Sequence, residues 1–150
     1  MLSRSKTLCM DASLVIRVIA TGMNAELQSV LKEWEQQRVR YIAPNLLGYE
    51  LANSLHRHGG YPPGSRILDA VVEVWQAMGI ESIDYPSLHL EAMELARKFG
   101  HPASYDAHYL AVARRLGVDF FTCDRRLANS VQNEFDWVHY VNPALDSNMS

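Results

Sequence analysis

The sequence predicts a three-layer α/β/α fold with a central, mainly parallel sheet of four to five strands. Two observations predict this class. Short apolar runs of strand length alternate with longer segments in which apolar residues recur at three- and four-residue steps. The chain has 150 residues, 48% hydrophobic and 21% charged, which is enough for one domain with its own core. We therefore expect a single domain over residues 1–150.

Five apolar runs are the expected strands. Each is short and is bounded by turn-forming, acidic or helix-starting residues. In chain order they are residues 7–11, 40–44, 80–84, 118–124 and 137–142. Pro143 closes the last one, because proline cannot donate a hydrogen bond to a sheet.

Six segments with helical periodicity lie between these runs. They are residues 13–20, 25–37, 45–57, 65–78, 88–99 and 104–116. The clearest apolar face belongs to 65–78, and its members are Ile67, Leu68, Val71, Val72, Trp75 and Met78. That face is either part of the core or a surface for a partner. The tail, residues 144–150, is expected to be flexible.

Composition and charge narrow the function classes. The formal net charge of −3 argues against a large, strongly basic surface for nucleic acid, although a small site with local basic residues remains compatible. Cys9 and Cys123 lie in apolar runs without metal-ligand spacing, which indicates buried free thiols. No apolar run reaches the length of a membrane span, and Asp11 interrupts any signal-peptide core. We expect a soluble, cytoplasmic protein.

Two aspartates follow predicted strands directly. Asp11 ends the first strand and Asp124 ends the fourth. In open parallel sheets, functional sites form outside the carboxyl ends of the strands, so both positions suit chemistry. Aspartate is also favoured as the N-cap of a helix, and a helical pattern follows each of the two. Both explanations stay open at this point.

Glu50 lies at the margin of the leucine stripe on the predicted helix 45–57. It shares that side of the helix with Asn53 and Arg57. A solvated edge residue is the simpler interpretation of this position. The polar neighbours would also suit the wall of a wet cavity.

Asp106 is the most informative acid because of the direction in which it points. Ser104 can serve as the N-cap, which leaves Asp106 in the first turn, where the helix dipole favours acids. The residues that share its side of the helix are apolar or aromatic: Tyr109, Leu110 and Ala113. An acid on an inward face must be paired, neutralised or bound to a cation, because an isolated buried carboxylate is expensive.

A divalent cation would account for all four acids together. No lysine or arginine lies at an obvious pairing position beside them. If they converge, their mutual repulsion raises some pKa values unless positive charge is bound between them. Oxygen ligands favour Mg²⁺ or Mn²⁺ over zinc or copper. One or two such ions would supply the missing charge.

Four segments carry a resemblance to a known family. They are residues 10–16 (MDASLVI), 43–57 (APNLLGYELANSLHR), 103–117 (ASYDAHYLAVARRLG) and 120–129 (FFTCDRRLAN). In this order and at this approximate spacing they resemble the PIN-domain family, and most closely the VapC-type toxins of toxin-antitoxin pairs. The resemblance runs over nearly the whole chain.

The resemblance implies an endoribonuclease that depends on Mg²⁺ or Mn²⁺ and hydrolyses RNA phosphodiester bonds. The acidic quartet of its catalytic and metal site would be Asp11, Glu50, Asp106 and Asp124. Ser13 and Thr122 match the hydroxyl positions beside the first and last acids, and Asn53 matches a position that is often polar. The resemblance also implies a homodimer and a cognate antitoxin that holds the toxin inactive.

RNA binding requires positive charge near the acids. The candidate phosphate contacts are Arg17, Arg57, Arg125 and Arg126, with solvated surface arginines as the alternative. Tyr49 and Tyr105 precede Glu50 and Asp106, and they are candidates for stacking on unpaired bases. Packing in the core or at its rim is the simpler explanation for both tyrosines.

Three other functions compete with the toxin. A PIN-type nuclease of RNA processing would have the same site without an antitoxin. A receiver-like signalling module needs a lysine at the end of a later strand, and Lys98 lies instead within a predicted helix. A non-catalytic interaction domain would use its acids only as helix caps.

Overall fold

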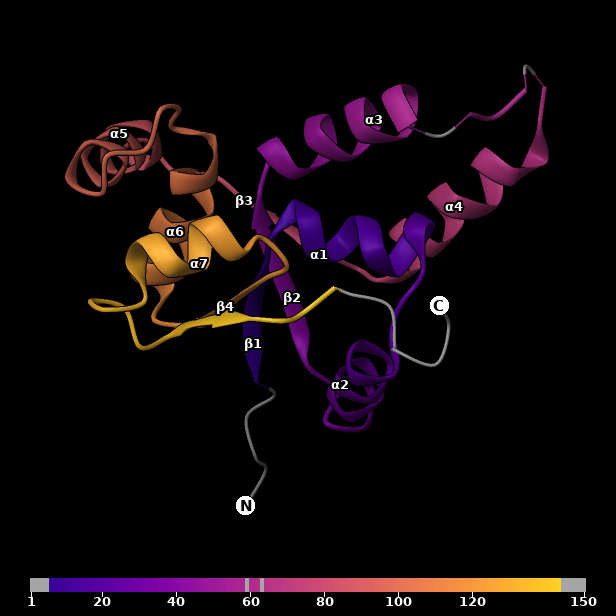
Figure 1. The fold of residues 1–150 in the computed structure, drawn as a ribbon, viewed down its shortest axis with the longest axis horizontal. Helices are drawn as coiled ribbons and strands as arrows, with labels where there is room; N and C mark the ends of the chain where they lie inside the picture. Colours follow the sequence, from indigo (N-terminus) through magenta and orange to yellow (C-terminus); the bar gives the residue numbers. More distant parts are fainter. Residues whose placement is uncertain (1–5, 59, 63, 144–150) are drawn as a thin grey trace.

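The core of the fold is one parallel sheet (Figure 1). The computed structural model describes residues 6–58, 60–62 and 64–143, and the predicted flexible tail lies outside this part of the chain. Within it the strands are β1 (Thr7–Met10), β2 (Arg40–Pro44), β3 (Glu81–Ile83), β4 (Asp119–Thr122) and β5 (Val138–Tyr140). Their order is β3-β2-β1-β4-β5, and every neighbouring pair is parallel. Each strand lies inside the predicted range.

The helices of the described chain confirm the six predicted segments. They are α1 (Ala12–Ile16), α2 (Ala25–Gln36), α3 (Leu46–His58), α4 (Arg66–Ala77), α5 (Leu88–Lys98), α6 (Tyr105–Leu116) and α7 (Arg125–Val131). The segment predicted as 13–20 is divided, because a π-helical turn, η1 (Arg17–Thr21), follows α1. The prediction omitted α7, since seven residues are too few for a helical period to repeat convincingly.

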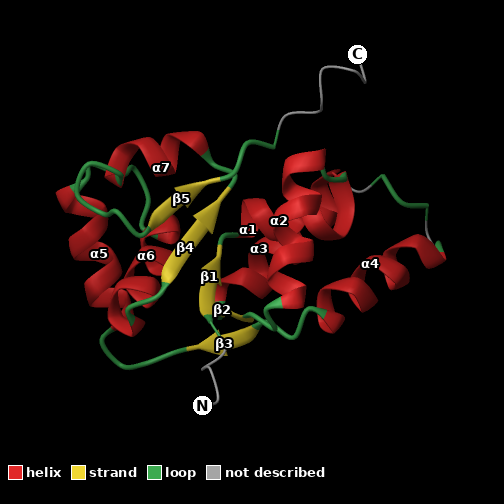
Figure 2. Ribbon diagram, turned by 90° about the horizontal axis from the view of Figure 1, so that it is seen from below, coloured by secondary structure: helices red, strands yellow, loops and turns green. Residues whose placement is uncertain are grey.

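Helices cover both faces of the sheet. Figure 2 shows α5, α6 and α7 on one side and α1 to α4 on the other. Successive residues of β4 divide between these layers, because side chains alternate along a strand. The Phe120 ring lies 6.2 Å from that of Tyr109 on α6, whereas the Phe121 ring lies 4.8 Å from that of Trp34 on α2. The predicted three-layer class is therefore confirmed.

The apolar face predicted on 65–78 is only partly buried in this structure. Val71 is buried, and Trp75 and Met78 pack partly against the core. Ile67 is 58% exposed and Leu68 is 38% exposed. The sequence left two explanations for this face, the core or a surface for a partner. The exposed outer half fits a partner surface better.

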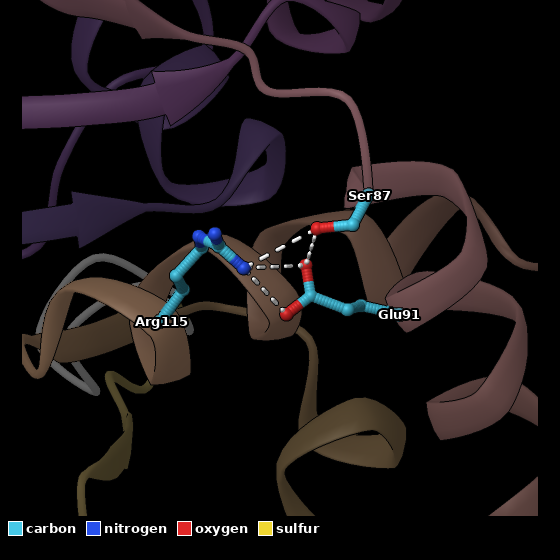
Figure 3. A network of polar contacts seen from close by, with 3 residues as sticks. All are labelled: Ser87, Glu91 and Arg115. Atoms are coloured by element: carbon cyan, nitrogen blue, oxygen red, sulfur yellow. Dashed lines mark hydrogen bonds and ion pairs between the residues drawn. The ribbon is translucent and has the colours of Figure 1, made fainter.

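A polar network connects α5 to α6 (Figure 3). Arg115 Nη1 donates to both carboxylate oxygens of Glu91, at 3.2 and 3.4 Å, and to Ser87 Oγ at 3.3 Å. Ser87 Oγ in turn donates to Glu91 at 3.2 Å. The guanidinium also lies over the Tyr85 ring, 4.3 Å from its centre. The network thus ties the segment after β3 to the helix that carries Asp106.

Cys9 and Cys123 are both buried and free, as predicted.

Within the described residues, no single helix is both long and apolar enough to cross a membrane. The segments 12–20 and 25–36, bent by 98° at the break between them, pass that length and composition test only as a joined pair.

Candidate active site at the carboxyl edge of the sheet

Asp11 and Asp124 lie side by side because their strands are neighbours. β1 and β4 are parallel, so their carboxyl ends share one edge of the sheet. Each acid caps the helix that follows: Asp11 Oδ1 accepts from Ala12 N at 2.9 Å, and Asp124 Oδ1 accepts from Leu127 N at 3.1 Å. The capping explanation is therefore correct for both. It occupies one oxygen of each carboxylate and leaves the site explanation open.

Two hydroxyl groups join these strand ends. Thr122 Oγ1 donates to Asp11 Oδ2 at 2.6 Å and accepts from the backbone N–H of Asp124 at 2.9 Å. Ser13 Oγ donates to the same Asp11 oxygen at 2.6 Å and accepts from Cys123 N at 3.0 Å. Ser13 and Thr122 therefore lie beside the first and last acids, and they hold the Asp11 carboxylate in one orientation.

Glu50 reaches the same region from α3. The hydroxyl of Tyr109, on α6, donates to Glu50 Oε1 at 2.7 Å. Burial and the Glu50 charge raise the pKa of Tyr109 far above its usual value, so the phenol stays protonated and remains a donor. The sequence placed Tyr109 only on the inward face of its helix. Its position three residues after Asp106 was the available signal for a polar role.

Asp106 is half-buried in the first turn of α6. The residues that share its side are fully buried, which confirms the predicted direction: Tyr109, Leu110 and Ala113. Ser104 stands at the N-cap of α6, as predicted, but its side chain makes no capping hydrogen bond, because its backbone (φ −91°, ψ −1°) is outside the extended region that suits one. The Ser104 carbonyl oxygen instead accepts from His108 Nδ1 at 2.7 Å.

The Asp11 carboxylate is a poor place for an isolated charge. The residue is 4% exposed. Burial raises the pKa of Asp11 to about 6, and the charges of Asp106 and Asp124 act in the same direction. The hydrogen bonds from Ser13 and Thr122 favour the ionised form and offset part of this shift.

The other acids are coupled in the same way. Burial raises the pKa of Asp106 to about 6, and the charges of Asp124 and Glu50 add to the shift. Burial also raises the pKa of Glu50, although the Tyr109 hydrogen bond opposes it, and the Asp11 charge contributes. The four acids of the predicted quartet thus lie near enough to perturb one another.

An open cleft of about 430 Å³ lies over this edge. Its walls include Glu50, Asp106, Asp124 and Arg126. Three acids and one arginine therefore face one volume, as a site for a cation and a phosphate requires.

His101 also lines this cleft, and the sequence prediction missed it. Its Nε2 lies 2.9 Å from Ser130 Oγ, which donates to the Leu127 carbonyl at 2.7 Å. Since that hydroxyl proton is committed, His101 Nε2 carries the donated hydrogen. Burial lowers the pKa of His101, while the Asp124 charge opposes this. The signal for this residue was its place in the loop before α6, at the same sheet edge.

The remaining predicted contacts are dispersed. Arg125 lies over the Tyr140 ring, 5.3 Å from its centre. Arg17 is half-buried, and its charge lowers the pKa of Cys123, which burial raises to about 11. Arg57 and Asn53 are exposed on α3 and do not line the cleft. Of the four predicted arginines, only Arg126 shares the cleft with the acids.

The donor set fits a hard divalent cation by its chemistry. The cleft offers carboxylate oxygens, whose mutual repulsion a bound dication would relieve. Within the residues that the structure describes, no three His, Cys, Asp or Glu side chains are already gathered into a metal-binding cluster. Both oxygens of Asp11 and one oxygen each of Asp124 and Glu50 accept the hydrogen bonds given above. The acids are therefore neighbours rather than a preformed cage.

The fold and this edge define a parallel α/β protein with an acidic cleft at the carboxyl ends of its strands. The PIN domain family model matches residues 8–131, and the chain belongs to the PIN-domain family. The resemblance found in the sequence is thereby confirmed.

Three relatives show how far the similarity extends. The chain is 34% identical over 89 residues to ribonuclease VapC3 of Pyrobaculum aerophilum, a match over 56% of this chain and 66% of that relative, just under two thirds of its length. The crystal structure of PAE2754 from Pyrobaculum aerophilum has a TM-score of 0.61 at 22% identity, over 83% of this chain and 86% of that one. FitAcB from Neisseria gonorrhoeae has a TM-score of 0.56 at 13% identity, over 89% and 96%. The two structures establish the fold alone.

Proposed function

We propose that this protein is an endoribonuclease that uses Mg²⁺ or Mn²⁺ to hydrolyse phosphodiester bonds of RNA. One observation carries the proposal. Glu50, Asp106 and Asp124 line a single cleft, and Thr122 connects the fourth acid, Asp11, to Asp124. Membership of the PIN-domain family and similarity to a protein named ribonuclease VapC3 support it.

The four acids are proposed to hold the cation. They are Asp11, Glu50, Asp106 and Asp124. A divalent ion in such a site would lower the pKa of a bound water. It would also offset the negative charge that develops on the phosphate during the reaction. The four carboxylates carry enough negative charge for one or two such ions.

The other side chains of the site have supporting parts. Ser13 and Thr122 orient the Asp11 carboxylate through hydrogen bonds of 2.6 Å. Tyr109 orients Glu50 through a hydrogen bond of 2.7 Å. Arg126 lines the cleft and is placed to contact a phosphate, for which guanidinium is well suited.

The toxin assignment is a further part of the proposal. The similarity of this chain to a protein named ribonuclease VapC3 supports it. The antitoxin is proposed to cover the exposed apolar face of α4, where Ile67, Leu68 and Val74 are 58, 38 and 46% exposed. We further propose a cytoplasmic homodimer. A neighbouring reading frame that encodes a DNA-binding domain with an unstructured tail would support the pair, and its absence would favour a nuclease of RNA processing.

A cleavage assay tests the central proposal. Purified protein is incubated with total RNA in Mg²⁺, in Mn²⁺ and in EDTA, beside the Asp11→Asn variant. Cleavage that needs the cation and disappears in the variant supports the proposal. Equal cleavage by wild type and variant would indicate a contaminating nuclease, and no cleavage in either cation contradicts the assignment.

A further inference from the structure

A second hollow lies beside the acidic cleft. Its volume is about 420 Å³, within the range of roughly 300–1,000 Å³ that is usual for small-molecule sites. Its lining is mostly apolar and aromatic, with Pro44, Leu46, Tyr49, Leu88 and Tyr105 among its residues. Tyr49 is 77% exposed and Tyr105 is 60% exposed, so neither tyrosine is packed in the core, and a position at its rim is what remains of the simpler explanation.

The hollow and the cleft share a wall. Tyr105 lines both of them, on the cleft side together with Asp106. Tyr49 likewise precedes Glu50, which lines the cleft, while Tyr49 itself lines the hollow. Adjacent helical residues point in directions about 100° apart, so each acid and the tyrosine before it serve neighbouring volumes.

We propose that this hollow is a base-binding subsite, in which one unpaired nucleobase beside the scissile phosphate stacks on Tyr49 and Tyr105. The inference rests on the proposed ribonuclease function and specifies its substrate as single-stranded at that base. Exposed aromatic rings beside a phosphate site are the usual means of holding an unpaired base. The shared lining at Tyr105 favours a nucleic-acid occupant, because a strand bound in the cleft would lie next to a ring that also lines the hollow.

The polar rim of the hollow carries hydrogen-bond acceptors. His108 Nδ1 donates to the Ser104 carbonyl, so in the neutral ring Nε2 is an acceptor. His89 Nδ1 lies 3.0 Å from that Nε2 and must supply the hydrogen, which leaves the lone pair of His89 on Nε2. The exposed carboxylate of Asp84 lines the same hollow. Acceptors at the rim favour bases with an exocyclic amine, namely adenine, cytosine and guanine, over uracil.

The test uses binding without cleavage. The full-length protein in EDTA is titrated into a single-stranded RNA 10-mer with one 2-aminopurine, whose fluorescence falls when the base stacks on a ring. Wild-type protein is expected to quench the probe. Tyr49→Leu and Tyr105→Leu keep apolar bulk but lose the ring, and each is expected to weaken binding roughly 5- to 150-fold and to lose the quenching. Leu90→Ser, at an exposed apolar position outside the hollow, is the matched control.

The base preference gives a second readout. Competitor 10-mers of adenine or cytosine should displace the probe better than uracil 10-mers, and Asp84→Asn should reduce that difference. Unchanged quenching and affinity in both tyrosine variants would overturn the subsite. That result would leave the nuclease itself untouched, because the cleavage assay tests it separately. If Tyr49→Leu instead converts a dimer to monomers in sedimentation, the hollow is an interface between copies and the subsite is overturned. Cleavage is scored separately, so a failed nuclease is recognised independently.

Discussion

Thr122 Oγ1 lies 2.6 Å from Asp11 Oδ2, and this hydrogen bond joins residues 111 positions apart in the chain. The same oxygen accepts from the backbone of Asp124, so one hydroxyl orients the first acid and the loop of the last. The contact exists because β1 and β4 are parallel neighbours. It makes the acidic edge a single unit rather than two separate helix caps.

Thr122→Val is expected to destabilise the fold at pH 7. The change keeps the shape but removes the donor to a buried carboxylate, which costs about 1.5–3 kcal/mol. The free energy of unfolding, measured by urea denaturation, checks this. Thr7→Val, at the partly buried start of β1, is the matched control and should change it much less. Equal losses in the two variants would show that the Thr122 hydroxyl has no special part.

The pH dependence of the free energy of unfolding should reveal the raised pKa of Asp11. Its pKa is about 6 in the folded protein against 3.8 ordinarily, so between these values the folded state binds the proton more tightly than the unfolded state. The contribution of Asp11 is therefore most favourable below about pH 4 and declines as pH rises through 6.

Asp11→Asn removes this titration. In EDTA at pH 7 the free energy of unfolding of the variant should exceed that of the wild type by about 3 kcal/mol, which corresponds to a shift of about two pKa units. The difference should vanish near pH 4. Chemical denaturation at the two pH values measures it. A stability difference that does not depend on pH would contradict the raised pKa.

Tyr109→Phe is expected to slow RNA cleavage and to move the acid limb of its pH profile upward. The hydrogen bond from Tyr109 lowers the pKa of Glu50, so its removal raises that pKa and Glu50 loses its charge at a higher pH. Initial rates between pH 5 and 8 check both effects. A slower rate with an unchanged profile would indicate that the phenol only supports packing.

Mn²⁺ is expected to raise the melting temperature of the wild-type protein at pH 7.5. A ligand that binds only the folded state stabilises it by about 2.7 kcal/mol at a concentration 100 times its Kd. Asp106→Asn should lose most of this rise in melting temperature. Asp106 lines the cleft, and its carboxylate interacts with the charges of Asp124 and Glu50. Asp136→Asn, an exposed acid beyond α7, should keep it. Equal shifts in both variants would place the ion elsewhere.

Arg126→Gln should weaken RNA binding in EDTA. The slope of log affinity against log salt concentration should fall in magnitude by about one, the value expected for one lost phosphate contact. Arg126 lines the cleft, whereas Arg57 is exposed on α3 away from it. Arg57→Gln therefore serves as the matched control. Fluorescence anisotropy at several salt concentrations measures the slope, and a larger effect at Arg57 would move the RNA path to α3.

Much of the fold was predictable because its signals are local. The alternation of apolar runs and helical periods indicated β1 to β5 and α1 to α6 from neighbouring residues alone. Asp11 and Asp124 were recognisable as site candidates because each ends a buried strand, and the direction of Asp106 followed from the helical period. Their roles in metal binding and catalysis stay predictions.

The remainder depended on contacts between distant residues. The sequence by itself determined the five strands, the helical segments that became α1 to α6, and which acids could meet at one edge. Only the tertiary structure decided that Tyr109 bonds to Glu50, that Arg126 rather than Arg57 shares the cleft, and that Tyr49 and Tyr105 stand exposed. The physical reason is that periodicity specifies the direction of a side chain on its own element. What that side chain meets is set by parallel strand pairing and helix packing, which bring together residues separated by 59 to 111 positions.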